Sequence, residues 1–416
     1  MSFQTLCHTV DPAAFRFHPP DIQNPKTVVT NTQAEETIAN AANLLASDEV
    51  IAMPTETVYG LAANALSPAA IAKIYAAKNR PQDNPLIVHV SSLAMLEDIL
   101  PGNQIPPIYL SVIKRFWPGP LTIILPKSDL IPSAITCHQP TVAVRFPSHS
   151  IARALITQCG FPLAAPSANS SGKPSPTLAS HVMSDLNTKI PLVLDSGQCD
   201  FGIESTVLDA LRHPPAILRP GGVTYEQLKE VPGLEALQVY KKHFVDKQLE
   251  ILPTTPGMKY RHYSPEAQVV LFERTSDRED QIVKDCNING GNSYDSPAVV
   301  VTSSLDHLLL SSIIHEMRQF MLVGKDRFGI LWTSQSHQKI NNSDLALSLP
   351  PKYTIVEHFL GSALQPEQVA RDLFKSMREM DANGVDVIFV EGISEDREGL
   401  AVMNRLRKAA SRIVTV

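Results

Sequence analysis

Short apolar runs typical of buried strands recur along the first half of the chain, with helical segments between some of them. Strands of this kind need cover on both faces, so they favour a sheet packed between helices. The pattern predicts a mixed-sheet α/β domain over residues 32–222. The predicted strands are Val50–Met53, Leu86–Val90, Leu121–Leu125, Val142–Phe146, Leu163–Ala165, Leu192–Asp195, Ser205–Leu208 and Ala216–Leu218.

Two helices of this domain have recognisable starts. Thr32–Glu35 matches a capping box, and the apolar face of a helix follows it over Ile38–Leu45. Ser67–Pro68 offers an N-cap and a first-turn proline for a second helix. We expect that helix to end near Lys78, because Pro81 cannot continue it.

The rest of the chain divides into three further parts. Residues 1–31 are predicted to be a floppy N-terminal extension, with a role in organelle targeting as the open alternative. Residues 223–265 have a weak hydrophobic periodicity and end in a stretch that contains several prolines and a glycine, which indicates a linker. Residues 266–416 form a second, smaller domain, in which strand-like runs alternate with helical segments. Asp285–Pro297 is polar and rich in Asn and Gly, so we expect a surface loop there.

Alternation of strands and helices in the second domain predicts a parallel sheet. A helix that begins near Pro366 would carry an apolar side from Val369 to Met380. This domain has no G-x-G-x-x-G motif and no acidic cluster, so its sequence predicts little chemistry. Its predicted strands are Val269–Phe272, Ala298–Thr302, Phe328–Trp332, Tyr353–Val356 and Val385–Val390.

Composition excludes several classes of protein. The chain has 416 residues, of which 44% are hydrophobic and 19% charged, as expected for two or three folded domains. Its net charge of −6 argues against a general nucleic-acid binder and limits any RNA contact to a local patch. The five cysteines are scattered, which favours a reducing compartment over a disulfide framework or a zinc site. No apolar run reaches the roughly 20 residues of a membrane span.

Two polar stretches stand out against this apolar background. Lys78–Pro81 combines a lysine and an arginine two positions apart, and Ser167–Gly172 is a Ser/Asn/Gly turn that follows a predicted strand. Guanidinium forks, ammonium groups and the N–H groups of such turns are what a phosphate cradle needs. The chain has no P-loop, no nucleophile elbow and no H-E-x-x-H motif to compete with this site.

The same residues also have purely structural explanations. Lys78 and Arg80 follow an apolar helix, where cations suit the helix dipole. His89 lies inside an apolar strand and would ordinarily be a hydrogen-bonded member of the core. The polar cluster in Pro54–Leu61 follows a strand and is either a ligand contact or a capped turn.

Arg145 ends a predicted buried strand, and a buried guanidinium requires an anion. That anion is either a ligand or a carboxylate of the protein. Glu56 and Glu204 are the two carboxylates that the sequence offers for a structural pair. The sequence does not decide among these three partners.

Taken together, these motifs closely resemble the YrdC-type threonylcarbamoyl-AMP synthase family in its long, two-domain form. The resemblance covers nearly all of the chain after about residue 30. No single motif is decisive, but their joint order is. The motifs are Pro54–Leu61, Lys78–Pro81, Asn84–Leu86, Trp117–Thr122, Val142–Pro147, Ala165–Gly172, Glu204–Val207, Ile217–Gly221 and, in the linker, Lys259–Pro265, where Ser264 stands in place of a common alanine.

The resemblance implies a reaction and a fold. L-Threonine, bicarbonate and ATP would give L-threonylcarbamoyl-AMP and pyrophosphate, and the product would serve the threonylcarbamoyladenosine modification of tRNA. The first domain would be a twisted YrdC-like α/β domain with a large cavity, and the second would be Rossmann-like. Mg²⁺ is expected on the phosphates of ATP, with the ATP oxygens rather than a protein cluster as its main ligands.

The resemblance also implies roles for individual residues. Lys78 and Arg80 would be the catalytic cations. The linker would act as a lid, with Tyr263 reaching the nucleotide. Threonine or its carbamate would be held by Thr57, His89, Arg145, Ala165 and Ser205, with Arg145 on the amino-acid carboxylate. ATP would be held by Lys78, Arg80, Asn84, Thr141, Ser167, Asn169, Ser175, Arg219 and Tyr263.

Two other functions compete with this interpretation. A non-enzymatic RNA-binding module disagrees with the acidic net charge. A carbamoyltransferase of the hydrogenase-maturation type would carry an acylphosphatase-like region and Cys-rich zinc motifs, which this sequence lacks. For the synthase we expect a cytoplasmic location, with a mitochondrial fraction as the open alternative. We also expect at most weak contact with tRNA, transfer of the product to a downstream threonylcarbamoyl transferase, and no membrane contact. A regulatory role of the second domain would be compatible with catalysis.

Overall fold

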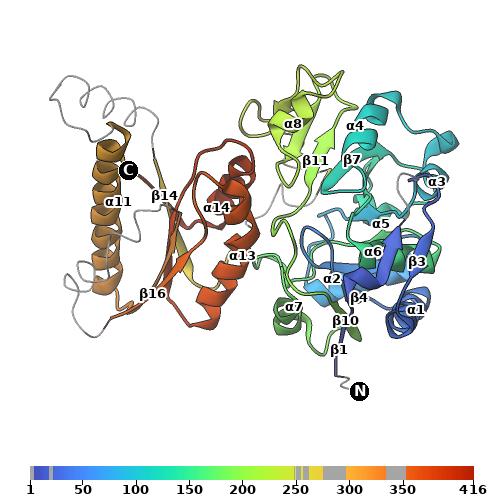
Figure 1. The fold of residues 1–416 in the computed structure, drawn as a ribbon, viewed down its shortest axis with the longest axis horizontal. Coiled ribbons are helices and arrows are strands. Elements are labelled where there is room, and N and C mark those ends of the chain that lie inside the picture. Colours follow the sequence, from blue (N-terminus) through green and yellow to red (C-terminus); the bar gives the residue numbers. More distant parts are fainter. Residues whose placement is uncertain are drawn as a thin grey trace. The chain divides into compact units, whose positions relative to one another are not determined.

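The computed structural model describes residues 4–17, 22–247, 249, 254–255, 262–274, 297–333 and 353–416. The chain forms two compact units, Met1–His262 and Tyr263–Val416 (Figure 1). Most of the predicted Asp285–Pro297 loop and the start of the Lys259–Pro265 motif lie outside the described residues. No helix within the described ranges is long and apolar enough to cross a membrane.

The first unit is built on a mixed sheet of eleven strands, which confirms the predicted fold class. Its order is β1-β10-β4-β5-β9-β6-β8-β7-β11-β12-β13, and parallel and antiparallel pairs occur along it. The strands are β1 (Leu6–Thr9), β4 (Ile51–Met53), β5 (Gly60–Asn64), β6 (Ile87–His89), β7 (Leu121–Pro126), β8 (Thr141–Arg145), β9 (Leu163–Ala164), β10 (Leu192–Asp195), β11 (Thr206–Asp209), β12 (Ala216–Arg219) and β13 (Gln238–Val239).

Each of the eight strands predicted in this unit is present, but the sheet also extends into segments where none was predicted. β1 pairs in parallel with β10, so the region predicted to be a floppy extension contributes an edge strand. β2 (Phe15–Phe17) and β3 (Thr27–Val29) form a hairpin in the same region. β13 pairs with β12, within the predicted linker. All four residues of β1 are exposed, which explains why no buried pattern marks it.

The helices of this unit are α1 (Thr32–Ala46), α2 (Pro68–Lys78), α3 (Leu93–Asp98), α4 (Leu110–Phe116), α5 (Ser133–Thr136), α6 (Ser150–Cys159), α7 (Ala179–Leu186) and α8 (Tyr225–Lys229). The predicted capping box of α1 is wrong, because Asn31 is the N-cap and accepts from the Ala34 N–H. The predicted start of α2 is confirmed: Ser67 Oγ accepts from the Ala70 N–H at 3.3 Å. Asn79 ends α2 in the left-handed conformation, with φ of 51°.

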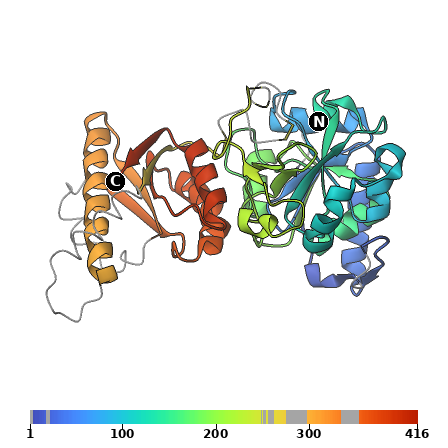
Figure 2. The ribbon, with the colours of Figure 1, turned by 90° about the horizontal axis from the view of Figure 1, so that it is seen from above.

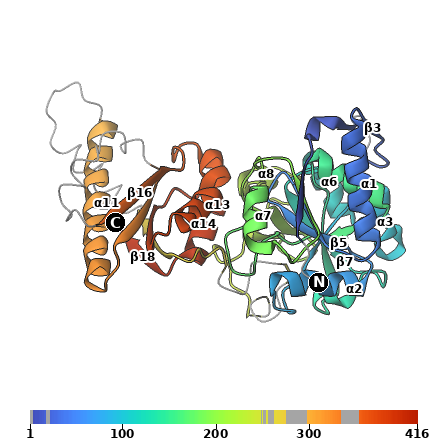
Figure 3. The same ribbon diagram turned by 90° about the horizontal axis from the view of Figure 1, so that it is seen from below.

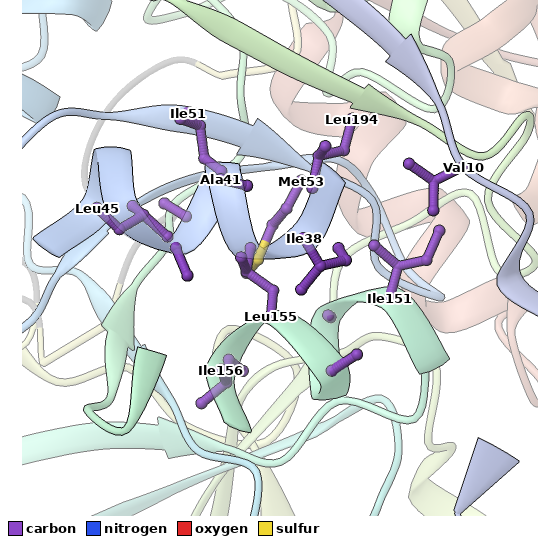
Figure 4. Close-up of a cluster of buried hydrophobic side chains, with 14 of the residues drawn as sticks. Val10, Ile38, Ala41, Leu45, Ile51, Met53, Ile151, Leu155, Ile156 and Leu194 are labelled. Atoms are coloured by element: carbon purple, nitrogen blue, oxygen red, sulfur yellow. The ribbon is translucent and has the colours of Figure 1, made fainter. Parts of the chain in front are cut away.

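A hydrophobic core packs α1 and α6 against each other and against β4 and β10 (Figure 4). Ile38 and Leu45 of α1 point toward Ile151 and Leu155 of α6. Met53 of β4 lies between the two helices. All of these side chains are at most 3% exposed, so the two helices fix the strand that leads into the predicted Pro54–Leu61 motif.

The second unit is a parallel sheet of five strands in the order β16-β15-β17-β14-β18. Helix α11 covers one face of the sheet, and α13 and α14 cover the other (Figures 2 and 3). This arrangement confirms the predicted parallel-sheet domain. The elements are β14 (Gln268–Glu273), α11 (Pro297–Leu322), β15 (Arg327–Trp332), β16 (Thr354–Phe359), α13 (Pro366–Ala382), β17 (Val387–Glu391), α14 (Gly399–Ala409) and β18 (Arg412–Thr415).

One predicted strand of this unit is wrong. Ala298–Thr302 lies within α11, a helix of 26 residues. A short valine-rich run suits a buried strand and a helix equally, and only the length of the surrounding apolar segment separates the two. The predicted apolar side of α13 is confirmed, because Val369, Leu373 and Met380 are each fully buried.

The core between α1 and α6 generates a test of the fold. We expect Leu155→Ala to lower the free energy of unfolding by about 3–5 kcal/mol, because the truncated side chain leaves a cavity in a fully buried site. Leu110→Ala is the control, since Leu110 is 54% exposed, and it should change stability by less than about 0.5 kcal/mol. Urea unfolding followed by circular dichroism measures both, and equal effects would contradict the described core.

Candidate active site

The register of the central strands aligns polar residues across the sheet. His89 of β6 lies opposite Arg145 of β8, and Arg145 lies opposite Thr122 of β7. Side chains of directly opposite residues share one face of a sheet. The three are buried, with exposed fractions of at most 4%. This row of polar groups therefore lies inside the first unit.

Arg145 is held by protein groups on each of its nitrogens. Nη2 lies 2.7 Å from Glu56 Oε1, and both side chains are at most 5% exposed. Nη1 donates to Thr57 Oγ1 at 2.8 Å, and Nε donates to the Gly119 carbonyl at 3.3 Å. The sequence offered Glu56 and Glu204 as carboxylate partners of Arg145, and the structure pairs Arg145 with Glu56.

The hydroxyl of Thr57 has a fixed direction. Thr55 Oγ1 donates its proton to the Val58 carbonyl at 2.6 Å. In the 2.9 Å contact between the two threonine hydroxyls, Thr57 must therefore be the donor. Its oxygen remains an acceptor for Arg145. Both threonines are buried, so the Pro54–Leu61 segment is more than a solvated turn.

His89 is a neutral imidazole in this setting. Burial and the nearby Arg145 guanidinium together lower its pKa to about 3, against the opposing effect of Glu56. Its Nδ1 lies 3.2 Å from the Ile87 carbonyl. A carbonyl only accepts, so this contact favours the tautomer with the proton on Nδ1, and the ring also makes a backbone hydrogen bond with Leu163.

Burial would raise the pKa of Glu56, but Arg145 and the backbone N–H of Ser148 lower it below its usual value. The carboxylate is therefore ionised, and the contact with Arg145 is an ion pair between charged groups. A buried pair of this kind costs desolvation energy, so a removed partner would leave an uncompensated charge.

A second polar group surrounds Ser205. Its hydroxyl lies 2.7 Å from Thr122 Oγ1, and Arg219 Nη2 donates to its carbonyl at 2.9 Å and to its Oγ at 3.2 Å. Gly221 has no room for a side chain, because a Cβ atom would collide with the backbone of Glu204 and Ser205. Close backbone approach thus holds the Ser205 hydroxyl against Thr122.

The two stretches that stand out in the sequence lie against each other. Lys78 Nζ donates to the carbonyls of Ser167 and Asn169, and the Ser171 N–H donates to the Lys78 carbonyl at 2.9 Å. Asn169 Nδ2 donates to the Lys173 carbonyl at 2.9 Å. Lys78 is 1% exposed, which excludes the alternative of a solvated helix end for this residue.

Arg80 and Asn84 form the neighbouring corner. Arg80 Nε donates to the Asn84 carbonyl at 3.1 Å, and Nη2 donates to the Pro85 carbonyl at 2.9 Å. Tyr75 of α2 also donates to the Asn84 carbonyl, at 3.2 Å. Arg80 is 7% exposed, so it too is buried rather than solvated.

The other predicted residues lie as follows. Ser175 donates to Glu204 Oε1, and both side chains are buried. The Ala165 N–H donates to the Ile87 carbonyl at 3.0 Å, next to His89. Thr141 begins β8 and is half-buried. It shares a face with Arg145, about 13 Å away along the strand.

Tyr263 belongs to the second unit. Its ring stacks on Phe374 of α13, with 5.2 Å between ring centroids, and the Arg405 guanidinium lies 5.7 Å from the Tyr263 ring. The predicted contact of Tyr263 with a nucleotide stays a prediction.

The segment Pro54–Leu61 connects the polar groups. Glu56 and Thr57 contact Arg145 at one end. At the other end, the Ala168 N–H donates to the Tyr59 carbonyl at 2.8 Å, and Gly60 bridges to Ser167. A Cβ on Gly60 would lie 3.2 Å from the Ala165 side chain, so a small residue is needed there. One segment thus touches both the arginine and the Ser/Asn turn.

Thr122 and Glu56 are the polar neighbours for which the sequence predicted no binding role. Thr122 is a hydroxyl inside an apolar strand, and strand alternation alone would have placed it on one face with Ile124. Within the described residues, no group of three or more His, Cys, Asp or Glu side chains could hold a metal ion.

Comparison with known proteins gives two family matches that adjoin along the chain. A family model described as telomere recombination matches residues 43–221. A second, described as the C-terminal domain of threonylcarbamoyl-AMP synthase, matches residues 223–411.

Curated relatives match over nearly the full length. A threonylcarbamoyl-AMP synthase of Schizosaccharomyces pombe is 40% identical, over 98% of both chains. The Bacillus subtilis protein of the same name is 41% identical, over 90% of this chain and 92% of the relative. The chain belongs to the threonylcarbamoyl-AMP synthase family.

A solved structure of a family member has the same two-domain fold. Sua5 of P. abyssi, crystallised with L-threonine, is 38% identical and aligns with a TM-score of 0.74, over 99% of this chain and 100% of that chain. The order of motifs in the sequence therefore identified the family correctly.

The buried His89 predicts how stability depends on pH. The imidazole has a pKa near 6.5 when unfolded and about 3 when folded, so between these values only the unfolded chain takes up the proton. The stabilisation is complete above pH 6.5 and is lost as the pH falls toward 3. On acidification we expect the free energy of unfolding of His89→Asn to fall less steeply than that of the wild type. The difference between the two slopes should be at most about 1.4 kcal/mol per pH unit.

Urea unfolding at pH 7 and at mildly acidic pH measures this difference. His138→Asn is the control, because His138 is exposed. Parallel pH dependences of the wild type and His89→Asn would contradict a buried neutral imidazole.

Proposed function

We propose that the chain is an L-threonylcarbamoyladenylate synthase that makes threonylcarbamoyl-AMP and pyrophosphate from L-threonine, bicarbonate and ATP. The observation that carries the proposal is the junction of Lys78 with the Ser167–Asn169 turn, inside a domain of this family. This contact supports the proposal because it brings together two stretches that are 89 residues apart in sequence and that each resemble a phosphate-binding motif.

The chemistry needs no nucleophile from the protein. Threonine and bicarbonate first condense to threonine N-carboxylate, with formation of the N–C bond and loss of water. A carboxylate oxygen of this carbamate then attacks the α-phosphorus of ATP, a new O–P bond forms, the bond to the β-phosphate breaks, and pyrophosphate leaves. The two reactants are both anions, so the site must offset their repulsion and hold them in line. Fixed cations and N–H dipoles do this without reorganising during the reaction.

The nucleotide side is assigned to the Lys78 corner. Lys78 and Arg80 stabilise the charge that develops on the phosphates, as the catalytic cations of the proposal. Arg219 approaches from β12, next to Ser205. The remaining nucleotide contacts are proposed for Asn84, Thr141, Ser167, Asn169, Ser175 and Tyr263.

The threonine side is assigned to the row that contains Arg145. Arg145 pairs with the amino-acid carboxylate. The hydroxyl of Ser205 contacts Thr122, the residue directly opposite Arg145 on the neighbouring strand β7. The neutral imidazole of His89, on β6, lies next to Arg145. Thr57 and Ala165 complete the proposed set. About 13 Å of β8 separates Arg145 from Thr141, enough for the amino acid and the phosphates to lie end to end.

Magnesium enters as part of the ATP substrate in this proposal. Mg²⁺ commonly keeps water and phosphate ligands and uses few protein carboxylates. The buried carboxylates near the site are Glu56, which pairs with Arg145, and Glu204, which accepts from Ser175. That donor set suits a metal held mainly by the phosphates.

Further parts of the reaction context are also proposals. The few scattered cysteines favour a reducing compartment and therefore a cytoplasmic enzyme, and a mitochondrial fraction is the alternative location. The labile mixed anhydride favours direct transfer to a downstream threonylcarbamoyl transferase, with weak contact to tRNA at most. Closure by the linker through Tyr263 would protect the intermediate from water.

A product assay tests the proposed function. Purified protein with Mg–ATP, L-threonine and labelled bicarbonate should form labelled threonylcarbamoyl-AMP, detected by mass spectrometry, together with pyrophosphate. We expect Lys78→Ala to lower kcat by about 100- to 1000-fold, as the loss of one preorganised donor does elsewhere.

Lys73→Ala is the matched control, because Lys73 lies on the same helix, is 43% exposed and pairs with Glu49. Its turnover should stay within about twofold of the wild type. Absence of the labelled product would refute the synthase, and normal turnover of Lys78→Ala would refute the role of that residue alone.

A further inference from the structure

Arg145 has little hydrogen-bonding capacity left for a ligand. A guanidinium carries five N–H groups. Thr57 accepts from one N–H of Nη1, Gly119 accepts from the N–H of Nε, and Glu56 forms an ion pair with Nη2 at 2.7 Å. The N–H groups left on Nη1 and Nη2 are enough for a single carboxylate. The orientation of this pair is set by the protein partners and not by the ligand.

The charge of Arg145 is compensated as well. Glu56 lies 2.7 Å away, and the two side chains are 2% and 5% exposed. His89 is neutral, because burial lowers its pKa to about 3. Burial also lowers the pKa of His149, although Glu56 and Asp200 act in the opposite direction. Asp200 itself is exposed to solvent. The pair formed by Arg145 and Glu56 is thus electrically neutral as a whole.

A neutral pair of fixed charges suits a ligand that also carries both signs. A free α-amino acid brings a carboxylate for Arg145 and an ammonium group that a nearby carboxylate attracts. A simple carboxylic acid brings only the anion, which Glu56 repels. In a buried site these interactions are weakly screened, so they influence affinity strongly.

We propose that Glu56 is a specificity-determining residue, which orients Arg145 and makes its subsite select a zwitterionic amino acid over an anion of the same shape at the step in which the free amino acid binds, before the carbamate forms. The inference rests on the proposed function, because it takes the Arg145 subsite as the one that binds threonine. Glu56 acts here through its charge and through Arg145, and it takes no part in the transfer of the adenylyl group.

The test compares two ligands that differ in one group. L-Threonine and 2,3-dihydroxybutanoate have the same carbon skeleton, and a hydroxyl replaces the amino group in the second. The affinity of each is measured by calorimetry on the full chain. The neutral substitution Glu56→Gln removes the repulsion of the carboxylate for both ligands equally. Only threonine also loses the attraction between its ammonium group and Glu56, so the ratio of the two affinities isolates that interaction.

We expect the wild type to prefer L-threonine and Glu56→Gln to reduce that preference by about tenfold or more. Glu56→Asp keeps the charge and should retain most of the preference. Glu49→Gln is the matched control, since Glu49 also pairs with a cation at 2.8 Å but is 42% exposed, and it should leave the ratio unchanged. A change in this ratio would not follow from a general loss of structure, which weakens both ligands.

Several outcomes would overturn the inference. An unchanged ratio in Glu56→Gln would do so while leaving the proposed function intact. Equal affinity of the wild type for the two ligands would overturn the inference without any variant. If Glu56→Gln fails to fold, loss of the preference in Glu56→Asp would overturn it as well. Failure of the wild type to bind L-threonine at all would overturn the proposed function and this inference together.

Discussion

The ion pair between Glu56 and Arg145 is the constraint around which the first unit is organised. Arg145 ends a central strand, and its charge is tolerated there because Glu56 lies 2.7 Å away. The partner comes from the segment after β4, which the α1–α6 core holds in place. That segment continues into β5 and pairs with the Ser/Asn turn. One electrostatic requirement thus fixes the backbone that brings the polar motifs together.

Most of the fold could be predicted from the sequence, because buried strands and capped helices leave local patterns. The strand Val142–Phe146 and the start of α2 at Ser67 are examples. The exceptions lack such patterns. β1 is exposed along its whole length, so its pairing with β10 depends on hydrogen bonds that any sequence can make. Ala298–Thr302 has strand-like composition, and its helical state depends on the longer segment around it.

The sequence motifs predicted which residues belong to the candidate site, but they did not predict which of these residues contact each other. The sequence marked Arg145 and required an anion for it, but two glutamates met that requirement equally, since residue types do not specify which side chains meet in space. Lys78 could equally have been a solvated helix end. The structure buries it against the carbonyls of a turn 89 residues away, a contact with no local signature.

The two ends of the site respond differently to substitution because they are built differently. Arg145 is oriented mainly by the side chains of Glu56 and Thr57, with one further bond to the Gly119 carbonyl. Lys78 instead donates to main-chain carbonyls of Ser167 and Asn169, so its removal withdraws both a charge and a support of the turn. At one end of the Pro54–Leu61 segment the contacts therefore mainly join side chains, whereas at the other end charge and backbone shape are coupled.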